Sequence, residues 1–444
     1  MTPRDLAPVL ERAGFLPEVA AERAARFEAV LACLLRAHPD DDSWDAWFVP
    51  GRVEVLGKHT DYAGGRSLIC TAERGFHAVA APRRDRRLVL HDVGRDTALA
   101  LDPDGPPPDV SWGTYPMTVV RRLSRNFPEL TRGADLVFAS DLPSAAGMSS
   151  SSALMIAVLL ALVRANRLDD TRTWRDNIRD HREDLAAYAA TIENGRTFRG
   201  LRGEGGVGTE GGSEDHTAIL CSRAGYLAQY AFCPTRHERS IALAPELTFA
   251  VGVSGIAARK TGEAREYYNR ASRNAARVLE RWRGGTGRTD ESLAAAVGSA
   301  ADAATRLRAM VAGDRDLVER FDQFLEESTE LVPAAAIALQ AGDLDRFGRT
   351  VARSQELAER LLHNQVPETV ALAGLAREQG ALAASAFGAG FGGSVWALVE
   401  LTEARAFLDR WQDAYRAACP GAAPRSRFFL TRPGPAVVRL NLGG

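Results

Sequence analysis

Hydrophobic and polar positions follow two different periods along this chain. Residues 4–37 place apolar side chains at helical spacing among charged ones, which predicts one or two leading helices. Between residues 66 and 140 the pattern becomes that of strands, most clearly at 88–93 and 135–139. An apolar run, 153–163, is too short to cross a bilayer and predicts a buried helix.

The pattern after about residue 245 is mainly helical. One strand at 248–252 is followed by long stretches rich in Ala, Arg and Leu, and further strands are expected at 394–399 and 427–431. This order predicts an α+β second domain with helices on one face of an antiparallel sheet. Helices are expected over residues 112–125, 171–196, 263–283, 290–312, 315–341, 343–363, 366–379 and 403–418.

Length and composition limit the possible classes of protein. A chain of 444 residues exceeds one ordinary hydrophobic core, so two domains are expected, here 1–240 and 241–444. A net charge of -2 argues against general nucleic-acid binding, which needs excess basic charge on one face. The five cysteines have no metal-binding spacing, and the N-terminus does not resemble a signal peptide. We therefore expect a soluble, reduced, cytoplasmic protein.

The most informative segment is Pro50–Gly65, with the sequence PGRVEVLGKHTDYAGG. It brings an arginine, a lysine, a histidine and an aspartate together between glycines, which packing alone would not require. His59 and Asp61 can divide donor and acceptor roles around the hydroxyls of a small polyhydroxylated molecule. The segment therefore predicts a sugar pocket.

A second motif, Asp141–Ala153 (DLPSAAGMSSSSA), lies between a predicted strand and the apolar helix. Small residues let backbone N–H groups approach an anion, and the helix N-terminus adds its positive dipole end. It is not a Walker loop, because the glycine spacing differs and no lysine follows. Serines also cap helices, but four in succession exceed that need. We predict a phosphate-binding loop made by Gly147, Met148, Ser149, Ser150, Ser151 and Ser152.

A third motif, Ser385–Ser394, places the glycine-rich stretch 388–393 at a turn into a strand. In this order the three motifs resemble the GHMP kinase superfamily, and specifically its galactokinase branch. Trp112–Tyr115 (WGTY) is similar to the family's adenine-pocket stretch, and Phe428–Gly434 to its terminal segment. The resemblance implies a two-domain α+β fold, with an S5-like N-terminal and a ferredoxin-like C-terminal domain. The active site would lie in the cleft between them.

The resemblance also implies ATP- and Mg²⁺-dependent phosphorylation of a sugar's anomeric hydroxyl. Asp215 occupies the place of the family's catalytic aspartate, and Arg52 matches the arginine that would keep it ionised. The predicted ATP contacts are Trp112 and the loop 147–152. The predicted Mg²⁺ ligands, all hard oxygen donors, are Ser150 or Ser151 and Glu193.

Sugar recognition is implied for Lys58, His59, Asp61 and Tyr62, and the chain departs from the family at the first of them. Lys58 and Lys260 are the only lysines among 55 basic residues, and the family has a glutamate in the place of Lys58. One interpretation is that Lys58 pairs with the carboxylate of an acidic sugar such as galacturonate. A second is that it donates to a hydroxyl of galactose or points to Glu54.

A further departure adds to the question of specificity. Glu54 stands where the family has an asparagine, and Ala264 falls where it has a sugar-contacting tyrosine, with Lys260, Tyr267 and Tyr268 nearby. The leading hypothesis is a kinase that forms the 1-phosphate of galactose or a galactose-like sugar. The alternatives are a kinase for an acidic sugar and a non-catalytic sensor of sugar and ATP. We expect no nucleic-acid, membrane or obligatory protein partner.

Overall fold

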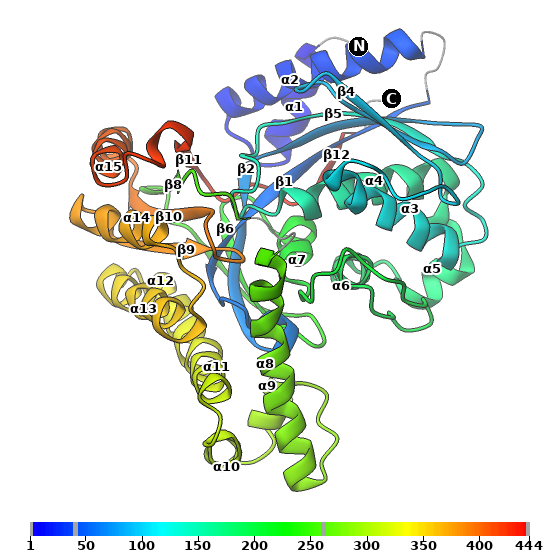
Figure 1. Ribbon diagram of the computed structural model, residues 1–444. Helices are drawn as coiled ribbons and strands as arrows, with labels where there is room; N and C mark the ends of the chain where they lie inside the picture. Colours follow the sequence, from blue (N-terminus) through cyan, green and yellow to red (C-terminus); the bar gives the residue numbers. More distant parts are fainter. Residues whose placement is uncertain (1–2, 39–42, 259–262, 441–444) are drawn as a thin grey trace.

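The computed structural model describes residues 3–38, 43–258 and 263–440, which form two β-sheets with helices packed on them (Figure 1). Within these residues the helices are α1 (Pro3–Arg12), α2 (Pro17–Ala37), α3 (Thr114–Asn126), α4 (Ser150–Asn166), α5 (Arg172–Asn177), α6 (Arg182–Asn194), α7 (Glu214–Cys221), α8 (Glu263–Thr286), α9 (Leu293–Val297), α10 (Ala303–Val311), α11 (Arg315–Glu326), α12 (Val332–Ala341), α13 (Leu344–Leu357), α14 (Pro367–Glu378) and α15 (Ala404–Ala418). The strands are β1 (Asp45–Leu56), β2 (Arg66–Pro82), β3 (Leu88–Asp92), β4 (Thr97–Leu101), β5 (Ala134–Ser140), β6 (Tyr226–Ala231), β7 (Arg236–Ala242), β8 (Leu247–Val253), β9 (Ala383–Phe387), β10 (Ser394–Glu400), β11 (Arg427–Thr431) and β12 (Val438–Leu440).

The larger sheet is built around the long antiparallel pair β1 and β2. In the described residues its strand order is β12-β1-β2-β5-β3-β4, and β6 and β7 extend it from β2. β3 and β5 run parallel, whereas the other pairs are antiparallel. Sequence reasoning expected strands between residues 66 and 140 but no strand in the first motif. The motif residues Pro50–Leu56 in fact belong to β1, so their side chains alternate between the two faces of the sheet.

Helices cover both faces of the larger sheet (Figure 1). On one face α1 and α2 bury residues such as Leu10 and Phe27 against Phe48 and Val79. On the other face α4 and α7 pack directly on β1 and β2, and α3 and α6 pack on these helices. The predicted buried helix is confirmed, because every residue from Ala153 to Leu159 in α4 is buried.

The smaller sheet has the order β11-β8-β10-β9 and is antiparallel throughout. The prediction that its helices lie on one face is wrong. Neighbouring residues of a strand point to opposite faces, and β10 buries both kinds. Val395 packs with the α14 and α15 side, for example with Trp411, whereas Trp396 packs against Phe347 of α13 on the other side. Both faces therefore need a helical layer.

Helices α8–α11 form an arm beside the first motif (Figure 1). Their apolar side chains, including Trp282 and Phe321, enclose a cluster that also contains Ala63 of the motif. The single helix expected over 290–312 is two short helices, α9 and α10. The arm therefore packs against the turn of the first motif.

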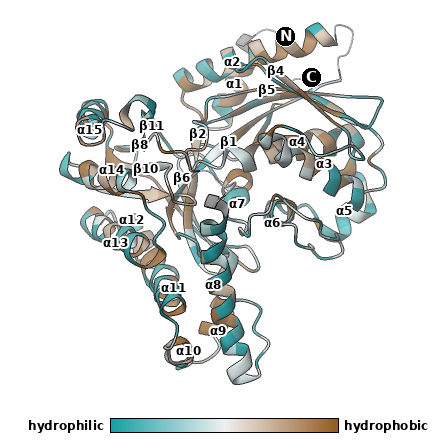
Figure 2. Ribbon diagram, in the orientation of Figure 1, coloured by the Kyte–Doolittle hydropathy of each residue, from teal (hydrophilic) through white to brown (hydrophobic). Residues whose placement is uncertain are grey.

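The chain passes from the larger to the smaller sheet between β7 and β8, close to the predicted division at residue 240. It returns at its end, because β12 pairs with β1 with Val438 opposite Phe48. The two predicted domains remain a prediction, and the described part of the second one contributes a strand to the first sheet. Hydrophobic residues line the strands and α4, whereas the outer helical surfaces are more hydrophilic (Figure 2). None of the described helices is long and apolar enough to cross a membrane.

Candidate active site between two cavities

Arg52 and Asp215 form the centre of the site. Arg52 lies on β1, and Asp215 lies in the first turn of α7. The Nε of Arg52 donates to Oδ1 of Asp215 over 2.7 Å, and its Nη1 donates to the carbonyl of Gly147 in the second motif. Burial lowers the pKa of Arg52, but nearby carboxylates, first that of Asp215, raise it above its ordinary value. Arg52 therefore stays protonated beside the carboxylate that the resemblance marks as catalytic.

The first cavity contains this pair and most of the predicted sugar-binding residues. His59, Asp61 and Tyr62 line it together with Arg52 and Asp215. Its other described lining residues are Glu54, Ala190, Glu193, Asn194, Gly211, Gly212, Glu214, His216, Tyr268, Gly388 and Ala389. The segments that meet here are thus β1, the first motif's turn, the start of α7 and the third motif.

His59 connects the first motif to the third. Its backbone has a positive φ of 59°, and its ring nitrogens lie 3.1 Å from the Tyr62 hydroxyl and 3.1 Å from the Ala389 carbonyl oxygen. Arg320 of α11 donates to the His59 carbonyl and, over 3.3 Å, to the Tyr62 hydroxyl. Burial raises the pKa of Tyr62 to about 12, so the phenol keeps its proton. Arg320 does not lie in any of the three sequence motifs, so sequence analysis had no signal that could have identified it.

Asp61 ties the turn of the first motif to α7. Its Oδ2 accepts a hydrogen bond from the backbone N–H of Glu214 over 3.0 Å. Gly212 packs so closely against this carboxylate that a Cβ there would lie 2.4 Å from Oδ2. The chain before Asp215 is rich in glycine, and at Gly212 the reason is steric, because only a residue without a side chain lets the loop approach Asp61 in the first cavity this closely.

Lys58 is placed apart from the other predicted sugar-binding residues. It is not among the described residues lining the first cavity, and only 1% of it is exposed. Its Nζ donates to the hydroxyls of Ser354 (3.0 Å) and Ser385 (2.8 Å), on α13 and β9. The adjacent backbone N–H groups of Gly57 and Lys58 donate to Oε1 of Glu327. Its ammonium therefore joins the first motif to the smaller sheet's layer.

The first cavity is also lined by two carboxyl groups that sequence analysis did not assign to the site, those of Glu54 and Glu214. Both Glu54 and Glu214 are buried. Burial raises the pKa of both, and for Glu214 the neighbouring Glu54 adds to the effect. A sequence signal for Glu54 existed, because the alternation in Arg52–Val55 predicts that Arg52 and Glu54 share one strand face.

The second cavity, of about 660 Å³, lies on the other side of Arg52 and is lined by the second motif and α3. Of the predicted ATP-binding residues, it contains Trp112, Gly147, Ser149, Ser150 and Ser151. Tyr115, from the stretch similar to the family's adenine pocket, also lines it. Sequence analysis missed further lining residues, among them Asp92, Arg95, Phe138 and Ser144. The cavity therefore combines an aromatic wall with a serine-rich one.

The second motif presents a helix N-terminus to this cavity. Ala145, Gly147 and Ser149 all have positive φ, which coils the chain just before α4 begins at Ser150. Among the described residues, no group hydrogen bonds with the buried Oγ of Ser149. A coiled backbone, a long helix's positive end and an unsatisfied hydroxyl together suit a phosphate group.

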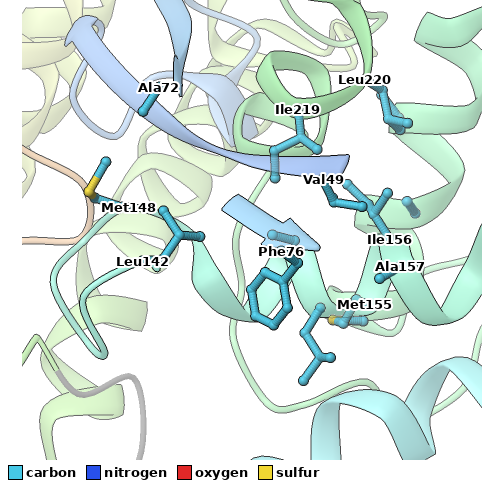
Figure 3. Close-up of a cluster of buried hydrophobic side chains, with 14 of the residues drawn as sticks. Val49, Ala72, Phe76, Leu142, Met148, Met155, Ile156, Ala157, Ile219 and Leu220 are labelled. Atoms are coloured by element: carbon cyan, nitrogen blue, oxygen red, sulfur yellow. The ribbon is translucent and has the colours of Figure 1, made fainter. Parts of the chain in front are cut away.

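Met148 and Ser152, also predicted to contact ATP, do not line the second cavity in the described residues. Met148 packs with Leu142 in the buried apolar cluster under the loop (Figure 3). Ser152 donates to Oε2 of Glu193 over 2.9 Å and lies 3.5 Å from Oδ2 of Asp215. The first turn of a helix exposes only part of its circumference, so Ser152 points inward, and Met148 is buried in the loop before the helix.

The predicted Mg²⁺ ligands lie on adjoining walls. Ser150 and Ser151 line the second cavity, and Glu193 lines the first. Among the described residues, no three His, Cys, Asp or Glu side chains are grouped as a metal site. Mg²⁺ usually takes one or two carboxylates, keeps several waters and is completed by phosphates, so a hydroxyl and a carboxylate at this border fit it. The assignment of these ligands stays a prediction.

The third motif separates the two cavities at one point. Ala389 lines both, and Gly388, with φ of 83°, packs against Gly147. A Cβ at Gly388 would lie 2.8 Å from the Gly147 carbonyl oxygen. Of the later residues noted in the sequence, Tyr268 lines the first cavity with its ring 5.4 Å from that of His59. Lys260 and the side chain of Ala264 lie outside the described residues.

Three family models match segments of this chain. They are GHMP kinases N terminal domain (residues 114–202), GHMP kinases C terminal (335–417) and the galactokinase galactose-binding signature (38–82). The first contains α4 and its phosphate loop, and the last contains β1 and the first motif. The matched segments thus include the serine-rich wall of the second cavity and the first-motif wall of the first cavity.

Two bacterial relatives and one solved structure extend this similarity along the chain. The galactokinase of Roseiflexus sp. (strain RS-1) is 29% identical over 88% of this chain and 92% of its own. The galactokinase of Streptomyces coelicolor is 28% identical over 89% and 94%. The crystal structure of Lactococcus lactis galactokinase complexed with galactose shares the fold, with a TM-score of 0.76, 22% identity and coverage of 93% and 100%. The chain therefore belongs to the GHMP kinase superfamily, within its galactokinase branch.

Proposed function

We propose that this protein is a galactokinase, which transfers the γ-phosphoryl group of ATP to the anomeric hydroxyl of galactose. One observation carries the proposal: the Arg52–Asp215 pair stands where two cavities adjoin. The first cavity is lined by the galactose-binding signature, and the second by a helix N-terminus suited to phosphates. Its relatives named galactokinase are similar over most of the chain.

Asp215 and Arg52 have distinct roles in this reaction. The carboxylate of Asp215 orients the sugar hydroxyl and accepts its proton, as a general base does. Arg52 holds that carboxylate ionised through the 2.7 Å hydrogen bond and neutralises charge on the phosphoryl group. Phosphoryl transfer depends mainly on positioning and charge neutralisation, and these two side chains provide the base and one of the neutralising charges.

Ser150 or Ser151 and Glu193 would hold Mg²⁺ at the border of the two cavities. The ion, when bound, neutralises phosphate charge during transfer. Ser152 keeps the Glu193 carboxylate in place, since it donates to Oε2 from the first turn of α4. The backbone N–H groups at the start of α4 contribute the rest of the positive potential for the phosphates.

A neutral sugar fits the described walls better than an acidic one. Lys58 was the basis of the acidic-sugar hypothesis, but its Nζ is hydrogen-bonded to Ser354 and Ser385. Of the described residues lining the first cavity, Arg52 is the only lysine or arginine, and it is paired with Asp215. A sensor is not favoured either, because the chain retains Asp215, Arg52 and the serine-rich loop that the kinase proposal needs.

The test is ATP turnover by the purified protein with Mg²⁺ and galactose, galacturonate, glucuronate, arabinose or fucose. We expect turnover with galactose and a sugar 1-phosphate as the product, which ³¹P NMR identifies from its chemical shift. Turnover with a uronic acid in place of galactose would contradict the proposal. So would nucleotide binding without phosphorylation of any of the five sugars.

A further inference from the structure

The first cavity contains a buried acceptor that the proposed reaction does not use. Glu54 lies two residues from Arg52 on β1, so both side chains project from one strand face, and both line the cavity. Only 4% of Glu54 is exposed, and no described residue hydrogen bonds with its Oε1. Buried carboxylate oxygens normally have a donor, so this oxygen is suited to a donor brought by a ligand.

Glu214 is the neighbouring buried carboxyl group in the cavity. Burial raises its pKa, and the nearby Glu54 carboxyl group adds to this effect. Glu214 is anchored, because its Oε2 accepts a hydrogen bond from the hydroxyl of Ser67 over 2.6 Å. Glu54 therefore has a fixed carboxyl neighbour, whereas its own Oε1 has no hydrogen-bond partner among the described residues.

Carboxyl groups outnumber cationic side chains among the described residues that line the cavity. Arg52 is the sole lysine or arginine among them, and Lys58, whose charge also acts on Glu54, has its ammonium bonded to serines outside the cavity. Five carboxyl groups against one guanidinium leave the lining net acidic even when one of the five is protonated. Such a cavity repels a ligand carboxylate and attracts hydroxyl and ammonium donors. The described carboxyl groups that line it are those of Glu54, Asp61, Glu193, Glu214 and Asp215.

We propose that Glu54 is a specificity-determining contact of the sugar site, where its Oε1 accepts a hydrogen bond from a hydroxyl or ammonium group of the sugar. The site then takes neutral and amino sugars of the galactose type and rejects uronic acids. This inference rests on the proposed galactokinase function and deepens it. It concerns a residue in which the chain departs from the family resemblance, so the preference belongs to this chain.

The experiment measures kcat and KM of the wild type, Glu54→Gln and Glu54→Asn with galactose, galactosamine and galacturonate. Glu400→Gln, an exposed glutamate at the end of β10, is the control for the same change outside the site. We expect the wild type to use galactose and galactosamine and to use galacturonate at least about 100-fold less well. Both Glu54 variants should raise KM for galactose about tenfold, which corresponds to one lost interaction of about 1.4 kcal/mol.

Galactosamine gives the sharper readout, because its ammonium gains most from a carboxylate. Its kcat/KM relative to galactose should fall at least about tenfold in both variants and stay unchanged in the control. Unchanged KM values and an unchanged ratio in both variants would overturn the inference, as would a wild type that prefers galacturonate. Thermal melting and binding of a non-hydrolysable ATP analogue verify that each variant is folded, and Glu54→Asn introduces the residue that the family resemblance has there.

Failure of the proposed function has a different signature. A wild type that turns over none of the three sugars counts against the kinase proposal. Calorimetric binding of the same sugars to wild type and Glu54→Gln then tests Glu54 independently of turnover. Loss of galactose and galactosamine binding in the variant would support the role of Glu54, and equal binding would overturn it.

Discussion

At the scale of single residues, the site depends on side chains that hold one another in a fixed charge state. Arg52 is surrounded by Asp215, Glu54 and Glu214, and these carboxylates raise its pKa against the opposing effect of burial. Burial raises the pKa of Glu54 and of Glu214, and Glu54 adds to the effect on Glu214. The Oδ1 of Asp215 accepts a hydrogen bond from Nε of Arg52, and Asp215 is the carboxylate that we propose as the base.

Replacing the predicted base tests this division of roles. Asp215→Asn keeps the size of the side chain but removes its ability to accept a proton, so kcat should fall about 10²- to 10⁴-fold. KM for ATP should change little, because Asp215 does not line the described second cavity. Steady-state kinetics with galactose measure both quantities. A variant that retains more than a tenth of the wild-type kcat would show that Asp215 is not the base.

At this scale, the sequence predicts well how residues within one motif are arranged. It predicts less well which residues of distant segments they contact. The strand alternation of β1 puts Arg52 and Glu54 on one face, and that is a local property. The direction of the Lys58 side chain is not a local property, because its hydrogen-bond partners Ser354 and Ser385 lie 296 and 327 residues further along the chain. The spacing of residues in the motif could not have shown that the ammonium of Lys58 is hydrogen-bonded to these two serines.

At the scale of elements, the first motif is held between layers that come from distant parts of the chain. Lys58 links β1 to α13 and β9, and Arg320 of α11 donates to the carbonyl of His59. The turn Asp61–Ala63, which carries predicted sugar-binding groups, is thus anchored by the second half of the chain. Changes in these helices should therefore act on sugar binding without contacting the sugar.

Removing the ammonium of Lys58 tests this anchoring. Lys58→Met preserves the length of the side chain but leaves the hydroxyls of Ser354 and Ser385 without their donor. We expect the free energy of unfolding to fall by about 1–3 kcal/mol, as for other lost buried hydrogen bonds. Urea titration measures this change. The ratio of kcat/KM for galactose over galacturonate should stay as in the wild type, and a shift of that ratio toward galactose would instead support direct recognition of a substrate carboxylate.

The layer of α1 and α2 on the larger sheet should make stability depend on pH. His77 of β2 is fully buried, and its ring packs on Phe27 (4.9 Å between centroids) and Phe48 (5.4 Å). Burial lowers its pKa from 6.5 to about 3. Between these pH values the unfolded chain binds a proton that the folded protein does not, so stability falls as the pH falls from about 6.5 toward 3.

His77→Phe removes this titration and keeps an aromatic ring in the layer. Between pH 7 and pH 5 the wild type should lose about 2 kcal/mol more unfolding free energy than the variant, at 1.36 kcal/mol per pH unit below 6.5. Denaturant unfolding at a series of pH values gives both curves, and comparing them cancels the other titrating groups. Parallel curves would mean that His77 is not kept neutral by the fold.

At the scale of the whole molecule, the site exists only where the two sheets' layers meet. The larger sheet supplies β1 and the phosphate loop, and the third motif, between β9 and β10, supplies Ala389 to both cavities. Gly147 and Gly388 pack against each other where these parts meet, and neither has a side chain that would hold the parts apart. Ligands that fill the cavities should therefore stabilise the folded protein as a unit.

This stabilisation is measurable by thermal melting. Any ligand that binds only the folded state adds RT ln(1 + [L]/Kd), which is about 2.7 kcal/mol at a concentration of 100 Kd. We expect galactose and a non-hydrolysable ATP analogue each to raise the melting temperature, and both together to raise it further. Galacturonate at the same concentration should have no effect. A shift produced by galacturonate but not by galactose would reverse the proposed substrate preference.

The sequence by itself determined the three motifs, the buried helix α4 and the chemical types gathered in each cavity, because strand alternation, helix starts and glycine turns depend on near neighbours. Only the tertiary structure decided that Lys58 faces Ser354 and Ser385, that Glu54 meets Glu214, and that helices cover both faces of the smaller sheet. These features join segments far apart in the chain. They follow from how whole layers pack, and a local pattern contains no information about which distant surface will cover it.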